Sequence, residues 1–135
     1  MKKTLTVAAL ALTLAAGSAL ATNTVRVMAS DGESLSYDML YTESAWMTLV
    51  VPMWALNHSV PGDLSLSVHG LPAGTTITLK GTTHQQRDGV LLLPVKVKRS
   101  STSVGVNSVA SIDLMSGGKV LTTLTIPVMG AAQGN

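Results

Sequence analysis

The chain has 135 residues, of which 46% are hydrophobic, 12% charged and 3% aromatic, and it contains no cysteine and no phenylalanine. Disorder requires low hydrophobicity and high net charge, so this composition predicts one small folded domain. The absence of cysteine excludes a disulfide framework, a thiolate metal site and a cysteine nucleophile.

Residues 1–21 have the three parts of a secretory signal peptide. Met1-Lys2-Lys3 form a positive start, residues 5–16 an uncharged run, and Ala19-Leu20-Ala21 a cleavage site of small residues. The apolar run is shorter than the about 20 residues that span a bilayer. We therefore expect a mature domain of residues 22–135, without a transmembrane anchor, in the periplasm or outside the cell at its surface.

Loss of the leader also removes two of the nine basic residues, so seven basic residues balance seven acidic ones. A formally neutral domain lacks the basic surface that nucleic acid requires, and no nucleic-acid partner is expected. The remaining basic cluster, Lys96, Lys98 and Arg99, is interpreted as the solvated face of a strand.

Along the mature chain, two short strands are expected at Val25–Ala29 and Leu35–Leu40, around a turn at Ser30–Glu33. The apolar run Trp46–Leu56 follows. Its Val-Val-Pro sequence suits a helix poorly, so a strand is favoured, either buried on both faces or bent at Pro52. A helix stays the alternative, because periodicity does not decide for a short continuous run.

From Leu64 onward, apolar and polar residues alternate with a period of two, which indicates half-buried antiparallel strands. The alternating segments are 64–69, 76–80, 91–98, 110–114 and 123–128. Turn residues separate them at 61–63, 70–74, 88–89 and 117–118. Seven or eight short strands in about 100 residues predict an all-β fold, an immunoglobulin-like antiparallel β-sandwich.

The stretch Trp54–Thr75, with Gly70-Leu71-Pro72-Ala73-Gly74 near its end, resembles bacterial immunoglobulin-like domains of the NEW3 type. The similarity of layout extends over residues 46–129, to the alternating strand Leu121–Val128. The resemblance implies a β-sandwich that serves as a non-catalytic module accompanying enzymes or surface proteins.

No catalytic or metal-binding pattern is present. His58, His69 and His84 lack the spacing of metal ligands, and no Gly-x-Ser-x-Gly sequence occurs. Asp31-Gly32-Glu33 is interpreted as an acidic turn, since calcium needs six or more oxygen ligands. We expect no enzyme, no metal and no cofactor, and a small secreted enzyme ranks last among the hypotheses.

The four aromatic residues Tyr37, Tyr41, Trp46 and Trp54 all lie between positions 37 and 54. One interpretation is a sugar-binding surface, because flat rings stack on pyranose faces. The other is that the tryptophans anchor the core, as sandwiches of this kind usually bury a tryptophan. The core interpretation is favoured.

Two further segments are candidates for contact with a partner. The polar stretch 82–89 is expected to be an exposed loop, with His84, Gln85 and Arg87 as contact residues. Val25, Val27 and Ala29 alternate near the N-terminus of the mature domain and are candidates for edge pairing with a neighbouring sheet.

These features favour an exported, non-catalytic interaction or structural module of the bacterial cell envelope, acting through sheet edges and loops. A protein partner or self-association is expected, with a subunit of a fimbrial or matrix assembly as one form. The alternative is a carbohydrate-binding module that uses Trp46 and Trp54 on a glycan.

Overall fold

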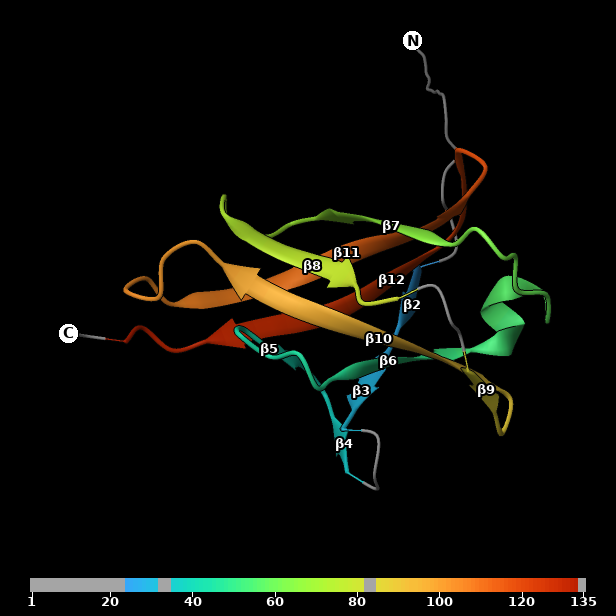
Figure 1. The fold of residues 1–135 in the computed structure, drawn as a ribbon, viewed down its shortest axis with the longest axis horizontal. Coiled ribbons are helices and arrows are strands. Elements are labelled where there is room, and N and C mark those ends of the chain that lie inside the picture. Colours follow the sequence, from blue (N-terminus) through green and yellow to red (C-terminus); the bar gives the residue numbers. More distant parts are fainter. Residues whose placement is uncertain (1–23, 32–34, 82–84, 134–135) are drawn as a thin grey trace, which may run out of the picture.

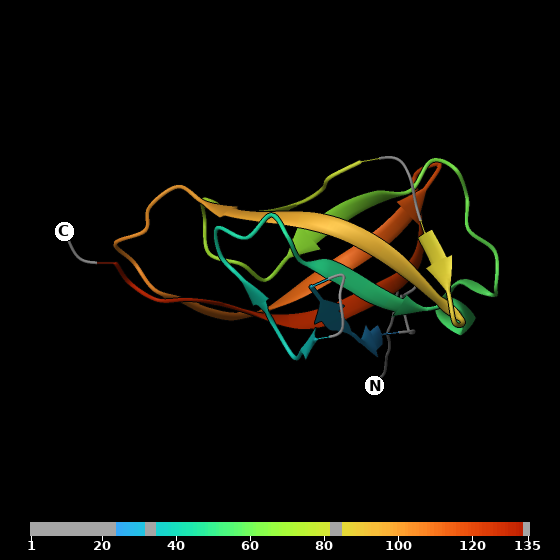
Figure 2. The same ribbon diagram turned by 60° about the horizontal axis from the view of Figure 1, so that its bottom comes forward.

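The computed structural model describes residues 24–31, 35–81 and 85–133, and for residues 85–87 the backbone alone. These residues form two β-sheets packed face to face (Figures 1 and 2). In Figure 2, β10 of the first sheet crosses over β11 and β12 of the second. The predicted leader 1–21 lies outside the described residues. The predicted all-β sandwich is confirmed.

The first sheet has the order β4 (Ser36–Tyr37), β3 (Met28–Ser30), β6 (Thr48–Pro52), β10 (Val90–Arg99) and β8 (Thr75–Leu79), with β9 (Gln85–Arg87) also on β10. The second has the order β2 (Thr24–Arg26), β12 (Lys119–Gly130), β11 (Val106–Ser116) and β7 (Ser65–His69), with β5 (Leu40–Tyr41) also on β12. The described residues thus hold more strands than the seven or eight expected, because several expected strands are divided.

Pro94 explains the division between β8 and β9, which pair with successive parts of β10. The Pro94 carbonyl accepts a hydrogen bond from the Lys80 N–H at 3.0 Å, so the backbone of Pro94 faces this side of β10. Proline has no N–H to donate there, and the neighbouring strand separates from β10 at this point.

Pro127 explains why the first strand changes sheets. β2 and β5 lie parallel to β12, a departure from the antiparallel pairing expected throughout. The Val27 N–H donates to the Thr125 carbonyl at 3.1 Å, and the next bond of a parallel ladder would come from the N–H of residue 127. Proline lacks that N–H, so the chain leaves β12 and continues as β3 in the first sheet.

The core lies between the sheets and follows the predicted alternation. Leu91, Leu93, Val95 and Val97 of β10 are fully buried and face residues of β11 and β12 that are equally buried: Ala110, Ile112, Leu114, Leu124, Ile126 and Val128. Tight turns join the long strands. Asp88-Gly89 and Gly117-Gly118 all have positive φ, as two-residue hairpin loops require.

The expected strand Trp46–Leu56 is confirmed only in part. β6 covers Thr48–Pro52, and Met53–Leu56 form a single turn of 3-10 helix, η1, with Met53 and Leu56 buried. Pro52, at φ −66°, precedes the turn, and Asn57 ends it in the left-handed conformation. Proline suits the position before a helix, because its missing N–H needs no partner there.

The Gly-Leu-Pro-Ala-Gly turn carries the chain from β7 in one sheet to β8 in the other. Gly70 has φ 87°, and a Cβ atom at this position would lie 2.7 Å from the Val109 carbonyl oxygen. Both the conformation and the close approach require glycine. Gly74, also at φ 87°, accepts a hydrogen bond from Ser100 N at 2.9 Å, which ties the turn to the end of β10.

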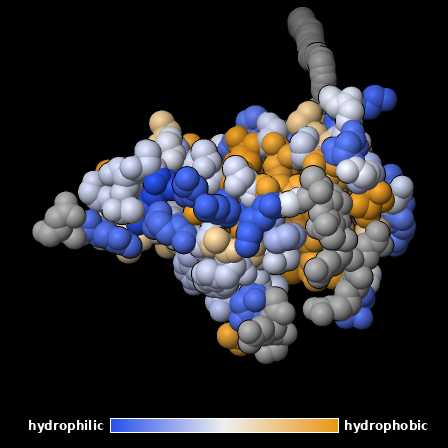
Figure 3. All heavy atoms as spheres, in the orientation of Figure 1, coloured by the Kyte–Doolittle hydropathy of each residue, from blue (hydrophilic) through white to orange (hydrophobic). Residues whose placement is uncertain are grey.

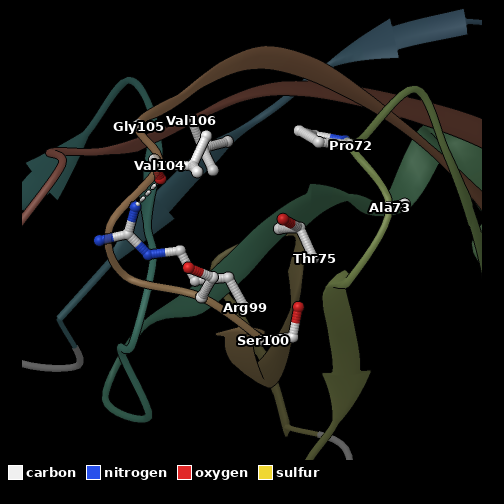
Figure 4. Close-up of a pocket in the computed structure, with 9 residues that line it drawn as sticks. Pro72, Ala73, Thr75, Arg99, Ser100, Val104, Gly105 and Val106 are labelled. Carbon is white, nitrogen blue, oxygen red and sulfur yellow. Dashed lines mark hydrogen bonds between the residues drawn. The ribbon is translucent and has the colours of Figure 1, made fainter.

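Arg99 departs from the prediction of a solvated basic cluster. Lys96 and Lys98 are exposed, but Arg99 occupies an inward position of β10 with its side chain 2% exposed. Its guanidinium donates to Glu43 Oε2 at 2.8 Å, the Val104 carbonyl at 2.6 Å and the Ala131 carbonyl at 2.7 Å. Figure 4 shows it beside the loop of Val104 and Gly105, at a small pocket of about 140 Å³. Arg99 thus holds three segments together at one end of the sandwich.

Candidate functional site

Three of the four aromatic side chains meet at one end of β6. The Tyr37 ring lies 6.0 Å from Tyr41 and 5.5 Å from Trp46, with the planes at 82° and 67°. We define Tyr37, Tyr41 and Trp46 as the aromatic cluster. Trp46 is 49% exposed, but the steep angles mean that the rings do not form one flat platform.

Trp54 does not belong to this cluster. It lies on η1, beyond the opposite end of β6, and is 62% exposed. The five residues of β6, roughly 17 Å of extended chain, lie between the two tryptophans together with Met47 and Met53. The interpretation that the tryptophans anchor the core is therefore wrong. The inward positions next to them are taken by Met47 and Met53, which are buried.

Because both tryptophans are exposed, Trp46→Ala and Trp54→Ala are expected to change the free energy of unfolding by less than about 1 kcal/mol each. A buried tryptophan would cost about 3–5 kcal/mol. Urea unfolding of the two variants measures the difference. A loss in the larger range would show that the side chain is packed in the core after all.

The loop before β6 is held by polar contacts. The Ser44 hydroxyl donates to the Tyr41 carbonyl at 2.6 Å, Tyr41 N contacts Met47 Sδ at 3.4 Å, and Lys80 Nζ donates to the Ala45 carbonyl. Ser44 is 2% exposed. The backbone that carries Trp46 is thus fixed from both sides.

Ser67, His69 and Asp113 lie together on the outer face of the second sheet. The Ser67 hydroxyl and the Asp113 carboxylate both lie 3.3 Å from the same histidine nitrogen, Nε2. A Ser-His-Asp triad requires its partners on different ring nitrogens, so that a proton taken from serine leaves the carboxylate contact in place. Asp113 also accepts a hydrogen bond from Thr123 at 2.7 Å. The set provides a cross-strand link and no proton relay.

The other histidines do not build a site in the described parts of the chain. His58 follows η1 with φ 59° and is exposed, and His84 lies outside the described residues. No group of three or more His, Cys, Asp or Glu that could hold a metal ion occurs in ranges 24–31, 35–81 and 85–133. Gln85 and Arg87 belong to β9, where they pair with Leu92 and Val90.

Asp63 links the turn before β7 to the β11–β12 hairpin. It accepts hydrogen bonds from the Ser116 hydroxyl at 2.5 Å and Gly117 N at 3.1 Å. The Ser116 hydroxyl, with a smaller contribution from backbone N–H groups, lowers the pKa of Asp63 below its ordinary value of 3.8.

A carboxyl group whose pKa is lower in the folded than in the unfolded protein stabilises the fold above the unfolded pKa. That stabilisation is lost as pH falls through the folded pKa. We therefore expect Asp63→Asn to be less stable than the natural protein at neutral pH, with the difference shrinking below pH 3.8. Thermal unfolding of both proteins from neutral to strongly acid pH tests this, and a pH-independent difference would contradict it.

The candidates for edge pairing, Val25, Val27 and Ala29, are at most 8% exposed and lie in the core of their own domain. β2 pairs with β12 of the same chain. The contact that the structure shows is thus intramolecular, and their pairing with a neighbour stays a prediction.

A different strand offers an open edge. β7 pairs with β11 and with no other strand among those described, so it ends the order of the second sheet. Its residues alternate, with Leu66 and Val68 packed against the core and Ser65 and His69 exposed. This edge was not predicted, because the periodicity of a sequence does not reveal which strand ends a sheet.

The direction of the backbone groups of β7 follows from the register. The Thr125 carbonyl faces β2, since it accepts from Val27 N. Successive residues of a strand direct their backbone groups to opposite sides. Leu124 therefore faces β11, where it is paired with Ile112, and the next residue, Asp113, faces β7. Asp113 is paired with Ser67, so the backbone groups of Ser67 face β11. The N–H and carbonyl groups of Leu66 and Val68 then point to the open edge.

The first sheet also has an apolar outer surface. Met28, Val50 and Leu92 lie in one row across β3, β6 and β10, and Met28 is 44% exposed. We define the outer patch as Met28, Val50, Pro52, Val90, Leu92 and Pro94. Figure 3 shows hydrophobic residues gathered where β10 runs beside β6, and hydrophilic residues toward β8. Of these residues Met28 is exposed and the other five are half-buried.

Comparison of the chain with models of protein families, with curated proteins and with solved structures gives no match. The resemblance to NEW3-type domains thus stays a prediction. Within the described ranges, no helix has the length and hydrophobicity that a membrane span needs.

Proposed function

We propose that the protein is an exported, non-catalytic binding module of the bacterial cell envelope, which binds its partner by adding a strand to the open edge of β7. The observation that carries this proposal is the edge itself, where no described strand pairs with the backbone groups of Leu66 and Val68. Such groups are a ready template for a further strand.

Other features support the proposal. The pattern of residues 1–21 favours export, and the chain has no cysteine. The Ser67-His69-Asp113 set has the residue types of a hydrolase but not the geometry. Strand addition between exported domains would join the subunits of a fimbrial or matrix assembly, in the periplasm or at the cell surface.

Val68→Pro tests the proposal directly. The N–H of Val68 points to the open edge, so proline removes no bond to β11 but blocks an incoming strand. We expect the tagged, exported protein to capture partners from an envelope extract, and Val68→Pro to lose at least about tenfold in capture, while Trp46→Ala retains it. Capture that is unchanged by Val68→Pro, in a variant with unchanged circular dichroism, would refute the proposal.

A carbohydrate-binding module is the second candidate, favoured by the exposure of Trp46 and Trp54. An open pocket of about 320 Å³ lies beside η1. Its lining combines the polar residues Asn57, Ser59 and Ser116 with apolar residues that include Leu121. For this function, binding to cell-surface polysaccharides should be lost in Trp46→Ala or Trp54→Ala and retained in Val68→Pro. The opposite pattern supports strand addition.

A further inference from the structure

We infer that the strand received by the edge of β7 is β7 of a second copy of this chain, running antiparallel about a two-fold axis at Ser67. This inference rests on the proposed function and names the partner. The two copies of the second sheet would join into one continuous sheet across the axis.

The side chains of β7 are complementary to themselves in this arrangement. A two-fold axis at Ser67 places Ser67 opposite its own copy, Leu66 opposite Val68 and Ser65 opposite His69. Apolar residues thus meet on the inner face, and polar residues meet on the outer face. Leu66 and Val68 are only partly buried in the single domain, so pairing removes further apolar surface from water.

The backbone fits the same axis. Because the backbone groups of Leu66 and Val68 point to the open edge, each Leu66 and the Val68 of the other copy form a hydrogen-bonded pair that exchanges two bonds. Ser67, whose backbone faces β11, then occupies a non-hydrogen-bonded position, where the Cα atoms of the two copies approach to about 4.5 Å.

β7 is also the least protected edge among the described strands. β2, β4, β5 and β9 are only two or three residues long. The edge of β8 is protected in two ways. Its Thr75 N–H already donates to the Pro72 carbonyl at 3.1 Å, and a lysine, Lys80, directly follows the strand. β7 carries no lysine and no proline, the residues with which edge strands usually prevent pairing.

The absence of cysteine from the chain allows a background-free test. In Ser67→Cys, the two thiols would lie on the axis within the Cα separation of about 4.4–6.8 Å that a disulfide accepts. Under mild oxidation of the purified protein, we expect a disulfide-linked dimer to form at least about tenfold faster than in Ser101→Cys, a cysteine on an exposed loop. Adding Val68→Pro, or Val68→Lys if the proline variant does not fold, should reduce the rate to that of the control.

Equal rates in Ser67→Cys and Ser101→Cys would overturn the inference, and so would rapid cross-linking that survives both substitutions at Val68. An equal mixture of Thr76→Cys and Thr78→Cys tests antiparallel pairing of β8 with its own copy. If this mixture forms the disulfide-linked dimer faster than Ser67→Cys, self-association occurs at β8, and the inference is overturned as well. If self-pairing fails while Val68→Pro still abolishes capture from the envelope extract, the proposed function stands with a different strand as partner.

Discussion

Arg99→Ala is expected to lower the free energy of unfolding by about 3–5 kcal/mol, because it removes a buried cation and leaves the three groups that accept its hydrogen bonds without their donor. The Val104 and Ala131 carbonyls would lose donors at 2.6 and 2.7 Å, and Glu43 would lose its ion pair. Equilibrium unfolding in urea, followed by tryptophan fluorescence, measures the loss.

The neighbouring Lys98→Ala provides the control, since Lys98 is exposed on the same strand and should cost less than about 0.5 kcal/mol. Glu43→Gln should have a smaller effect than Arg99→Ala, because the Glu43 side chain is 37% exposed and the two carbonyls keep their donor. Equal losses in Arg99→Ala and Lys98→Ala would mean that Arg99 is solvated.

Leu93→Ala is expected to cost about 2–5 kcal/mol, since Leu93 is fully buried at the centre of β10, opposite Leu49. The adjacent Leu92 points to the outer face, so Leu92→Ala should cost clearly less. The comparison depends on the strand register alone, because the two substitutions remove the same atoms. Unfolding in urea gives both values, and a larger loss for Leu92→Ala would show that the register is shifted by one residue.

The strands and core were predictable from the sequence because alternation along a strand is a local property. The alternation of Leu91, Leu93, Val95 and Val97 gave the buried face of β10 correctly, and the hairpin at Gly117-Gly118 was expected from its glycines. The breaks at Pro94 and Pro127 were not predicted, because each depends on which side of the strand the missing N–H faces.

The errors at the candidate site have the same origin. The sequence gives no sign that Met47 and Met53 take the inward positions and leave Trp46 and Trp54 exposed. Arg99 continues a run of exposed lysines in the sequence, yet it faces inward with Val95 and Val97. Two of the three acceptors that make its burial favourable, Glu43 and Ala131, are distant in the sequence. The open edge of β7 likewise depends on the order of strands in the sheet.

Backbone amide hydrogen exchange at β7, resolved by residue, tests most directly whether this edge is the binding surface. In dilute protein, the amides of Leu66 and Val68 should exchange rapidly and that of Ser67 slowly, since of these three residues only Ser67 directs its N–H toward β11. At high protein concentration or with a captured partner, Leu66 and Val68 should become protected while the rest of the sheet is unchanged. Rapid exchange of both amides under all these conditions, or slow exchange already in dilute protein, would contradict the open edge as the site of binding.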